Sequence, residues 1–311
     1  MAPADESPAQ DALPQIEVLH QSDRARIARV RLAGLVVVRK EPLGRDAGRR
    51  ARHELAILER LRGLEDVAQL VDAPLARSDG SIVLADAGDA TLRDLPKPLA
   101  VDELLTLAAD LARAVAAIHG RGVMHRDISP ANVVVSSEGA PCLVDFALAT
   151  SLGELRVEFV PQSGIDGTLA YLAPEQTGRT GRPVDHRADL YALGATLYEL
   201  ATGGPPFGVG DPLRLMHDLL ARVPTPPATL NPSLPAAFSQ IVLRLLEKEP
   251  DNRYQTADGV VYDLERVRDA AAGSAPAPIR LGERDLPLRL LPPSRLVGRD
   301  RAVAALQAAF E

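Results

Sequence analysis

Three polar residues near the middle of the chain have the types and the spacing that phosphoryl transfer requires. Asp127 directly follows His125 and Arg126, Asn132 comes five residues after Asp127, and Asp145 comes thirteen residues after Asn132. A carboxylate can accept the proton of an attacking hydroxyl or orient that hydroxyl. Amide and carboxylate oxygens are ligands that Mg²⁺ prefers when it is bound together with phosphates. We therefore predict a base at Asp127 and a magnesium site at Asn132 and Asp145.

A lysine and a glutamate further upstream are candidates for a phosphate-binding cation and its partner. Lys40 ends an apolar run that reads as a strand, and Glu54 lies on the helix predicted next along the chain. Arg39 is the neighbouring alternative cation. Because side chains alternate across a strand, Lys40 shares a face with Val38, whereas Arg39 points to the other face. The ammonium of lysine suits a triphosphate as a compact point charge, so Lys40 is preferred over Arg39.

The order of the predicted elements indicates an α+β fold with two lobes. Strand-like runs dominate the first part of the chain, at 16–19, 27–32, 35–40, 68–71 and 81–85, with a two-residue turn at Ala33 and Gly34 and a helix over 49–61. Helices dominate the remainder, at 101–119, 189–201, 213–221, 235–248 and 256–267, with short strands at 133–135 and 142–144. We expect a β-rich lobe over 14–87 and a larger α-helical lobe over 88–270.

The ends of the chain differ in composition from the middle. Residues 1–13 are predicted to be a disordered tail, and residues 271–295 a proline-rich linker. Residues 296–311 begin a new helix and are predicted to open a further, truncated domain. No apolar run is long enough to cross a membrane, and the N-terminus has no basic start followed by an apolar core, so we expect a cytoplasmic protein.

Charge and composition exclude some classes of partner. The net charge of −7 and the aromatic content of 3% argue against a basic patch or stacking platform for nucleic acid. The single cysteine, Cys142, lies in an apolar run and is expected to be a small buried side chain, not a reactive thiol.

Further motifs stand in order after the polar triad. They include Thr168 and Glu175 within residues 167–175, Asp189 at the start of residues 189–194, and Arg253 within residues 251–254. Together with residues 125–132 and 145–147, they resemble the eukaryotic-type Ser/Thr protein kinase domain. The resemblance covers residues 16–268 and implies a two-lobed kinase fold. It also implies ATP and Mg²⁺ as cofactors and a protein substrate, either the chain itself, an attached module or another protein.

The same resemblance implies a role for each matching residue. Lys40, paired with Glu54, would hold the α and β phosphates, and the backbone of Ala85 and Ala87 would contact adenine at the hinge. Structural and activation roles would fall to His125, Arg126, Phe146, Thr168, Glu175, Asp189 and Arg253, with Glu175 paired to Arg253 and Asp189 bracing the catalytic loop. Thr150, Ser151 and Ser163 are candidate phosphorylation sites, and the preferred alternative for each is a solvated loop hydroxyl. If one is modified, Arg126 is the expected partner of the added charge.

The chain departs from the family pattern at three places. No glycine occurs in residues 20–25, where the family has a glycine-rich loop, Ser129 replaces a lysine, and Ala147 replaces a glycine. Residues 144–150 and 167–179 resemble the N-terminal kinase module of large bacterial hybrid signalling proteins. Those proteins continue into an AAA/STAND-type ATPase, then GAF and histidine-kinase modules, and residues 296–311 are similar to the ATPase entry.

An active Ser/Thr kinase is the first interpretation of the function of this chain. A nucleotide-binding pseudokinase that regulates an attached ATPase or histidine-kinase region is the second, and a small-molecule phosphotransferase is the third.

Overall fold

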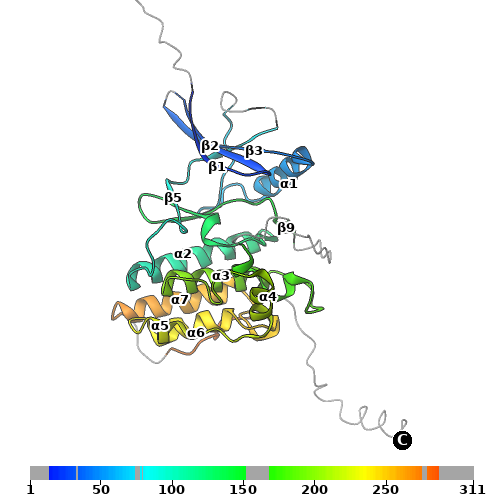
Figure 1. Cartoon of the computed structure of the whole chain (residues 1–311). Helices are drawn as coiled ribbons and strands as arrows, with labels where there is room; N and C mark the ends of the chain where they lie inside the picture. Colours follow the sequence, from blue (N-terminus) through cyan, green and yellow to red (C-terminus); the bar gives the residue numbers. More distant parts are fainter. Residues whose placement is uncertain are drawn as a thin grey trace, which may run out of the picture.

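The computed structural model confirms the two-lobed α+β fold. It describes residues 14–32, 34–73, 78, 80–151, 168–274 and 279–286. Figure 1 shows a small lobe of strands and one helix, drawn in blue, above a larger lobe of helices. One hydrophobic core runs through both lobes, because Ile57 and Leu84 of the upper lobe belong to the same buried cluster as Leu111 and Leu193 of the lower one.

The upper lobe is a four-stranded antiparallel sheet covered by one helix. The strands are β1 (Gln15–Gln21), β2 (Ala25–Leu32), β3 (Leu35–Pro42) and β4 (Ile82–Ala85), and they lie in the order β1-β2-β3-β4. Helix α1 (Ala47–Arg60) buries Ala51, Glu54, Ile57 and Leu58, which recur at helical spacing. A buried glutamate within this apolar stripe requires a charged partner, and β3 supplies one.

The prediction of a strand over residues 68–71 is wrong. Among the described residues, this segment makes one isolated bridge, an antiparallel one between Leu70 and Leu84, and the preceding Val67 makes a parallel one with Leu143. Its backbone bonds go to both lobes, since the amide of Ala68 donates to Leu143 and that of Val71 to Val83. A segment that changes partner after two residues cannot build a ladder along either one.

The lower lobe is built on helices, most of which the apolar periodicity predicts. They are α2 (Val101–Gly120), α3 (Arg187–Thr202), α4 (Pro212–Ala221), α5 (Pro227–Leu230), α6 (Ala236–Leu245) and α7 (Ala257–Ala271). Helix α3 is buried on all sides and forms the centre of the lobe. Gly194 lets α6 approach it closely, because a Cβ there would lie 2.6 Å from the Cβ of Leu245. No helix among the described residues is long and apolar enough to cross a membrane.

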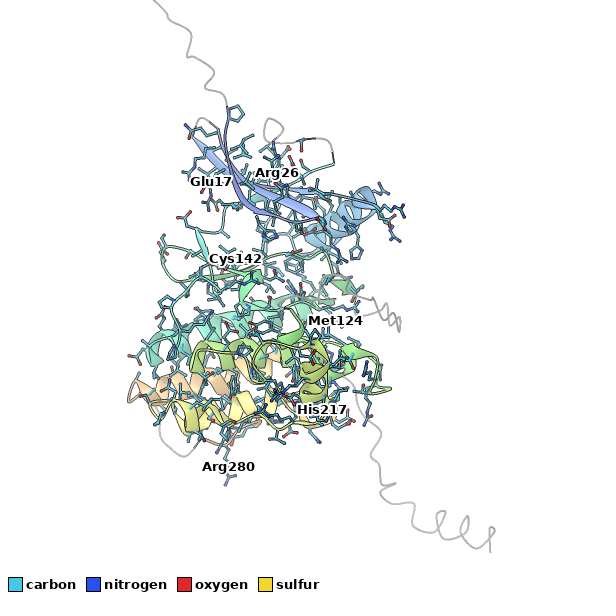
Figure 2. The ribbon with its side chains drawn as sticks, in the orientation of Figure 1. Glu17, Arg26, Met124, Cys142, His217 and Arg280 are labelled. Atoms are coloured by element: carbon cyan, nitrogen blue, oxygen red, sulfur yellow. The ribbon has the colours of Figure 1, made fainter. Side chains whose placement is uncertain are left out.

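Short elements between the lobes carry the candidate site. Strands β5 (Ala90–Thr91), β7 (Val133–Val135) and β8 (Pro141–Leu143) form a small sheet in the order β5-β7-β8. Strand β6 (Val123–Met124) pairs with β9 (Thr150–Ser151). Figure 2 labels Cys142 and Met124 in this region. Cys142 is half-buried, and burial raises the pKa of its thiol to about 12, so the thiol stays protonated.

Part of the predicted linker is docked on the lower lobe. Asp285 is 1% exposed at its side chain and forms an ion pair with Arg244 of α6 at 2.8 Å. Its other carboxylate oxygen accepts hydrogen bonds from the backbone amides of Gln255 and Thr256, at the start of α7. Figure 2 shows Arg280 on the side of the helical lobe away from the sheet. Residues 279–286 therefore complete the N-terminal end of α7.

We expect replacement of Asp285 by alanine to destabilise the chain. The change leaves Arg244 and two backbone amides without their acceptor, which should cost roughly 2–4 kcal/mol of unfolding free energy. Denaturant unfolding measures this cost. Glu283→Ala is the matched control, because its ion pair with Arg266 is 43% exposed at Glu283 and should contribute less than about 1 kcal/mol. Equal stabilities of the two variants would contradict the structural role of Asp285.

Candidate active site

The catalytic loop is held by one buried carboxylate on α3. Asp189 accepts hydrogen bonds from the backbone amides of His125 at 2.8 Å and Arg126 at 2.7 Å, and it contacts Nε2 of His119 at 2.9 Å. Arg126 has a left-handed backbone conformation with φ of 68°. A residue other than glycine in this region stores about 1–3 kcal/mol of strain, so Asp189 holds the loop in a shape that it would not adopt alone.

Asp127, the predicted base, and Asn132, a predicted metal ligand, lie side by side. The amide nitrogen of Asn132 donates to Oδ2 of Asp127 at 3.0 Å and to its backbone carbonyl at 2.8 Å. Oδ1 of Asp127 is buried and has no hydrogen-bond partner among the described residues. Burial, reinforced by the charge of Asp145, raises the pKa of Asp127 to about 7. A carboxylate with a pKa near neutrality is suited to accept a proton.

Lys40 contacts both Glu54, its predicted partner, and Asp145, which the sequence did not pair with it. Its Nζ lies 2.7 Å from Oε1 of Glu54 and 2.7 Å from Oδ1 of Asp145, so β3, α1 and the segment after β8 meet at one ammonium. Burial by itself would lower the pKa of Lys40, but the carboxylates outweigh it and raise that pKa. Arg39 points to the opposite face of the sheet, and its Nε lies 2.9 Å from Glu41.

Asp145 has a strained backbone, whereas Ala147 does not. Asp145 has φ of 63°, and Ala147 is not among the described residues with positive φ. The Cβ of Ala147 therefore causes no strain of that kind at the position where the family has glycine. The ring of Phe146 is fully buried and packs on His125, with the ring centroids 4.7 Å apart. The amide of Val144 donates to the carbonyl of Asn132 at 2.9 Å, which keeps the two predicted magnesium ligands on adjacent segments.

The hinge between the lobes follows β4 and passes close to β7. Gly88 has φ of 147°, and a Cβ on it would lie 2.2 Å from the carbonyl oxygen of Val135, so only glycine fits this path. The backbone amide of Ala87 has no hydrogen-bond partner among the described residues. Ala85 is the last residue of β4, and its amide donates to the carbonyl of Gln69 at 2.9 Å.

A tight turn stands where a glycine-rich loop would lie. The amide of Ser22 donates to the carbonyl of Ala25 at 2.9 Å, and Oγ of Ser22 accepts from the amides of Arg24 and Ala25. The carbonyl of Ala25 and the hydroxyl of Ser22 accept hydrogen bonds from these three amides, so the amides are not directed at a ligand. Contacts to phosphates are therefore expected from side chains, with Lys40 as the predicted cation.

Comparison with known proteins agrees with this geometry. The model of the protein kinase domain family matches residues 28–262. The chain belongs to the protein kinase family. It is 36% identical over 229 residues to serine/threonine-protein kinase PknB of Mycolicibacterium smegmatis, an alignment that covers 73% of this chain and 35% of that protein. It is 34% identical over 206 residues to PknB of Mycobacterium tuberculosis, covering 65% and 33% respectively. The kinase spans about a third of the length of these relatives.

In this kinase, the end of the activation segment is anchored by a buried ion pair. The guanidinium of Arg253 holds both carboxylate oxygens of Glu175, at 2.6 and 2.8 Å. The neighbouring Gln176 donates to the backbone carbonyl of Arg126 at 3.0 Å, which ties this segment to the catalytic loop. Thr168 begins a short 3-10 helix (Thr168–Tyr171).

The candidate phosphorylation sites lie in different settings. Ser163 is outside the described residues. Thr150 and Ser151 form β9, and Oγ of Ser151 accepts a hydrogen bond at 2.9 Å from Arg60, at the end of α1. This contact joins residues 91 positions apart, so no local pattern in the sequence could have shown it. Arg60 is thus the cation bonded to Ser151.

The raised pKa of Asp127 predicts a pH profile for this kinase. Asp127 accepts a proton only when ionised, so kcat/KM should fall about tenfold per pH unit below pH 7 and level off above it. Initial rates between pH 5.5 and 8.5 at fixed free Mg²⁺ test this. ATP binding over the same range is the control for titration of the nucleotide. A flat rate profile, or one that binding accounts for entirely, would contradict the role of Asp127.

Proposed function

We propose that this kinase domain transfers the γ-phosphate of ATP to serine or threonine hydroxyls of proteins in bacterial signal transduction. The observation that carries the proposal is the contact of Lys40 with both Glu54 and Asp145, beside an Asp127 that is paired with Asn132. These are the parts that phosphoryl transfer needs: a cation for the phosphates, carboxylate and amide oxygens for the metal, and a base.

Each residue has a defined place in this mechanism. Asp127 orients the substrate hydroxyl and accepts its proton as the oxygen attacks the γ-phosphorus, while the bond from phosphorus to the β-phosphate oxygen breaks. Lys40 binds the α and β phosphates, and Glu54 and Asp145 fix its position. The backbone amide of Ala87 and the carbonyl of Ala85 would bind adenine.

The donor set fits magnesium. Asp145 and Asn132 offer hard carboxylate and amide oxygens, which are the ligands that Mg²⁺ prefers. When bound, Mg²⁺ would neutralise the charge on the β and γ phosphates. The small number of protein ligands agrees with an ion that is bound together with ATP.

Phosphoamino-acid analysis with and without metal tests the proposal. The purified chain, given labelled ATP and a mixture of generic protein acceptors, should form phosphoserine or phosphothreonine. EDTA should abolish the labelling and excess Mg²⁺ should restore it. ATP binding without transfer to any acceptor would contradict kinase activity and support a regulatory pseudokinase.

The organisation of the longer protein is a separate proposal. We infer that the kinase domain begins near residue 14 and that residues 296–311, which lie outside the described residues, open an AAA/STAND-type ATPase. The support is the resemblance of residues 144–150 and 167–179 to the kinase module of hybrid signalling proteins. The contacts of Asp285 with Arg244 and with the start of α7 support a domain end later than residue 270.

A further inference from the structure

A buried arginine lies on the cleft side of the upper sheet, away from the residues so far given a role. Arg29 of β2 is 4% exposed. In the register of β2 and β3, Ile27 lies opposite Lys40 and Arg29 lies opposite Val38. Directly opposed residues share a face of the sheet, so Arg29 lies on the same face as Lys40. Figure 1 shows this sheet above the small strand β5.

The guanidinium of Arg29 is bonded chiefly to the hinge. Its Nε and Nη2 bind the two carboxylate oxygens of Asp86 at 2.7 and 3.1 Å, and Nη2 also donates to the carbonyl of Gly88 at 2.7 Å. Its Nη1 lies 2.8 Å from Asp89 and 3.7 Å from Glu17 of β1, which Figure 2 labels in the upper lobe. A bidentate contact of this kind fixes the orientation of Asp86 relative to Arg29 as well as the distance between them.

Arg29 forms hydrogen bonds to the residues on both sides of Ala87. Asp86 precedes Ala87 and Gly88 follows it, and the amide of Gly88 also bonds to Asp86 at 3.3 Å. On the far side, Gly88 lies against the carbonyl of Val135 of β7. The backbone of Ala87 is therefore held between the upper sheet and the lower lobe, with its amide unbonded among the described residues.

We infer that Arg29 is a positioning residue that fixes the hinge backbone for adenine and thereby sets the affinity of the kinase for ATP. The inference rests on the proposed use of ATP. Arg29 acts through Asp86 and Gly88, and it lies on a different strand from Lys40. Its loss should therefore affect nucleotide binding more than the chemical step.

Steady-state kinetics of Arg29→Met test the inference. We expect KM for ATP to rise roughly tenfold and kcat at saturating ATP to stay within about threefold. Direct ATP binding by calorimetry should weaken by a similar factor. Arg29→Lys should recover only part of the affinity, because an ammonium cannot make the two-pronged contact. Arg31→Met is the matched control, since Arg31 is 50% exposed on the same strand, lies 3.5 Å from Glu17, and should change KM less than twofold.

A second variant tests the same contact in case Arg29→Met does not fold. Asp86→Asn keeps the shape of the side chain but removes the charge that binds Arg29, and it should raise KM for ATP in the same way. Unchanged ATP affinity in the folded variants, or an equal rise in Arg31→Met, would overturn the inference. Calorimetry measures ATP binding even if no phosphate is transferred. An error in the role of Arg29 can therefore be told apart from an absence of kinase activity.

Discussion

Replacement of Asp127 by asparagine is expected to reduce phosphate transfer about a thousandfold while ATP affinity changes less than about threefold. Asparagine keeps the size of the side chain and can still bond to Asn132, but it cannot accept a proton. Asp127 does not contact Lys40, whose partners are Glu54 and Asp145. Rates and calorimetric ATP binding separate the two effects. A loss of less than tenfold would contradict the assignment of Asp127 as the base.

The same variant should become more stable than the wild type at alkaline pH. Burial raises the pKa of Asp127 to about 7, well above the ordinary value of 3.8, so the folded chain prefers the protonated carboxyl. The stability that this preference contributes is complete below pH 3.8 and is lost as the pH rises through 7. Asparagine does not ionise and avoids the loss. Thermal unfolding at pH 8 should therefore show a higher midpoint for Asp127→Asn, with a smaller difference at pH 5.5.

A control at an exposed carboxylate separates this effect from a general change in charge. Glu138 is exposed in the turn between β7 and β8. Glu138→Gln removes the same charge and should leave the unfolding midpoint unchanged at both pH values. A lower midpoint for Asp127→Asn at pH 8 would show that the ionised carboxylate stabilises the fold, contrary to its burial.

The largest expected effect on stability follows replacement of Arg253 by methionine. Arg253 and Glu175 are 0% and 1% exposed at their side chains, and Arg253 also donates to the backbone carbonyls of Glu247, Arg187 and Lys248. Removing one partner of a buried ion pair leaves the other charge uncompensated, which costs about 3–5 kcal/mol. Denaturant unfolding should show this loss. KM for a peptide substrate should also rise, because Glu175 anchors the end of the activation segment.

Two further variants test the origin of that cost. Glu175→Gln in the Arg253→Met background removes the isolated charge and should recover part of the lost stability. Arg182→Met is the matched control, because Arg182 pairs with Glu249 at 2.7 Å on the surface and should contribute less than about 1 kcal/mol. Equal losses in Arg253→Met and Arg182→Met would contradict the importance of burial.

The parts of the fold that the sequence predicts are those with a local signal. Helices α2 and α7 bury residues at helical spacing, and β2 and β3, which alternate in the sequence, pair as antiparallel neighbours. The polar triad is recognisable because its members lie within a short stretch of chain. The side of the sheet that Lys40 occupies follows from alternation alone, and the structure places Glu54 and Asp145 on that side.

The parts that the sequence does not reveal depend on partners far along the chain. The bond from Arg29 to Asp86 joins residues 57 positions apart, and Arg29 reads as one more arginine in an arginine-rich strand. Asp285 stands among prolines, where composition favours a linker, yet its carboxylate binds the start of α7. Residues 68–71 have apolar character typical of a strand but divide their hydrogen bonds between the lobes. In each case tertiary contacts override the local pattern.

Transfer of labelled phosphate from Mg-ATP to protein distinguishes an active kinase from a chain that only binds nucleotide. The purified chain is compared with Asp127→Asn and Asp145→Asn, at equal protein concentration and with folding verified by thermal unfolding. We predict clear labelling of serine or threonine by the wild type, a loss of about a thousandfold in Asp127→Asn, and a comparable loss in Asp145→Asn because it lacks the metal carboxylate. Equal labelling by all three proteins would show that neither Asp127 nor Asp145 takes part in phosphate transfer.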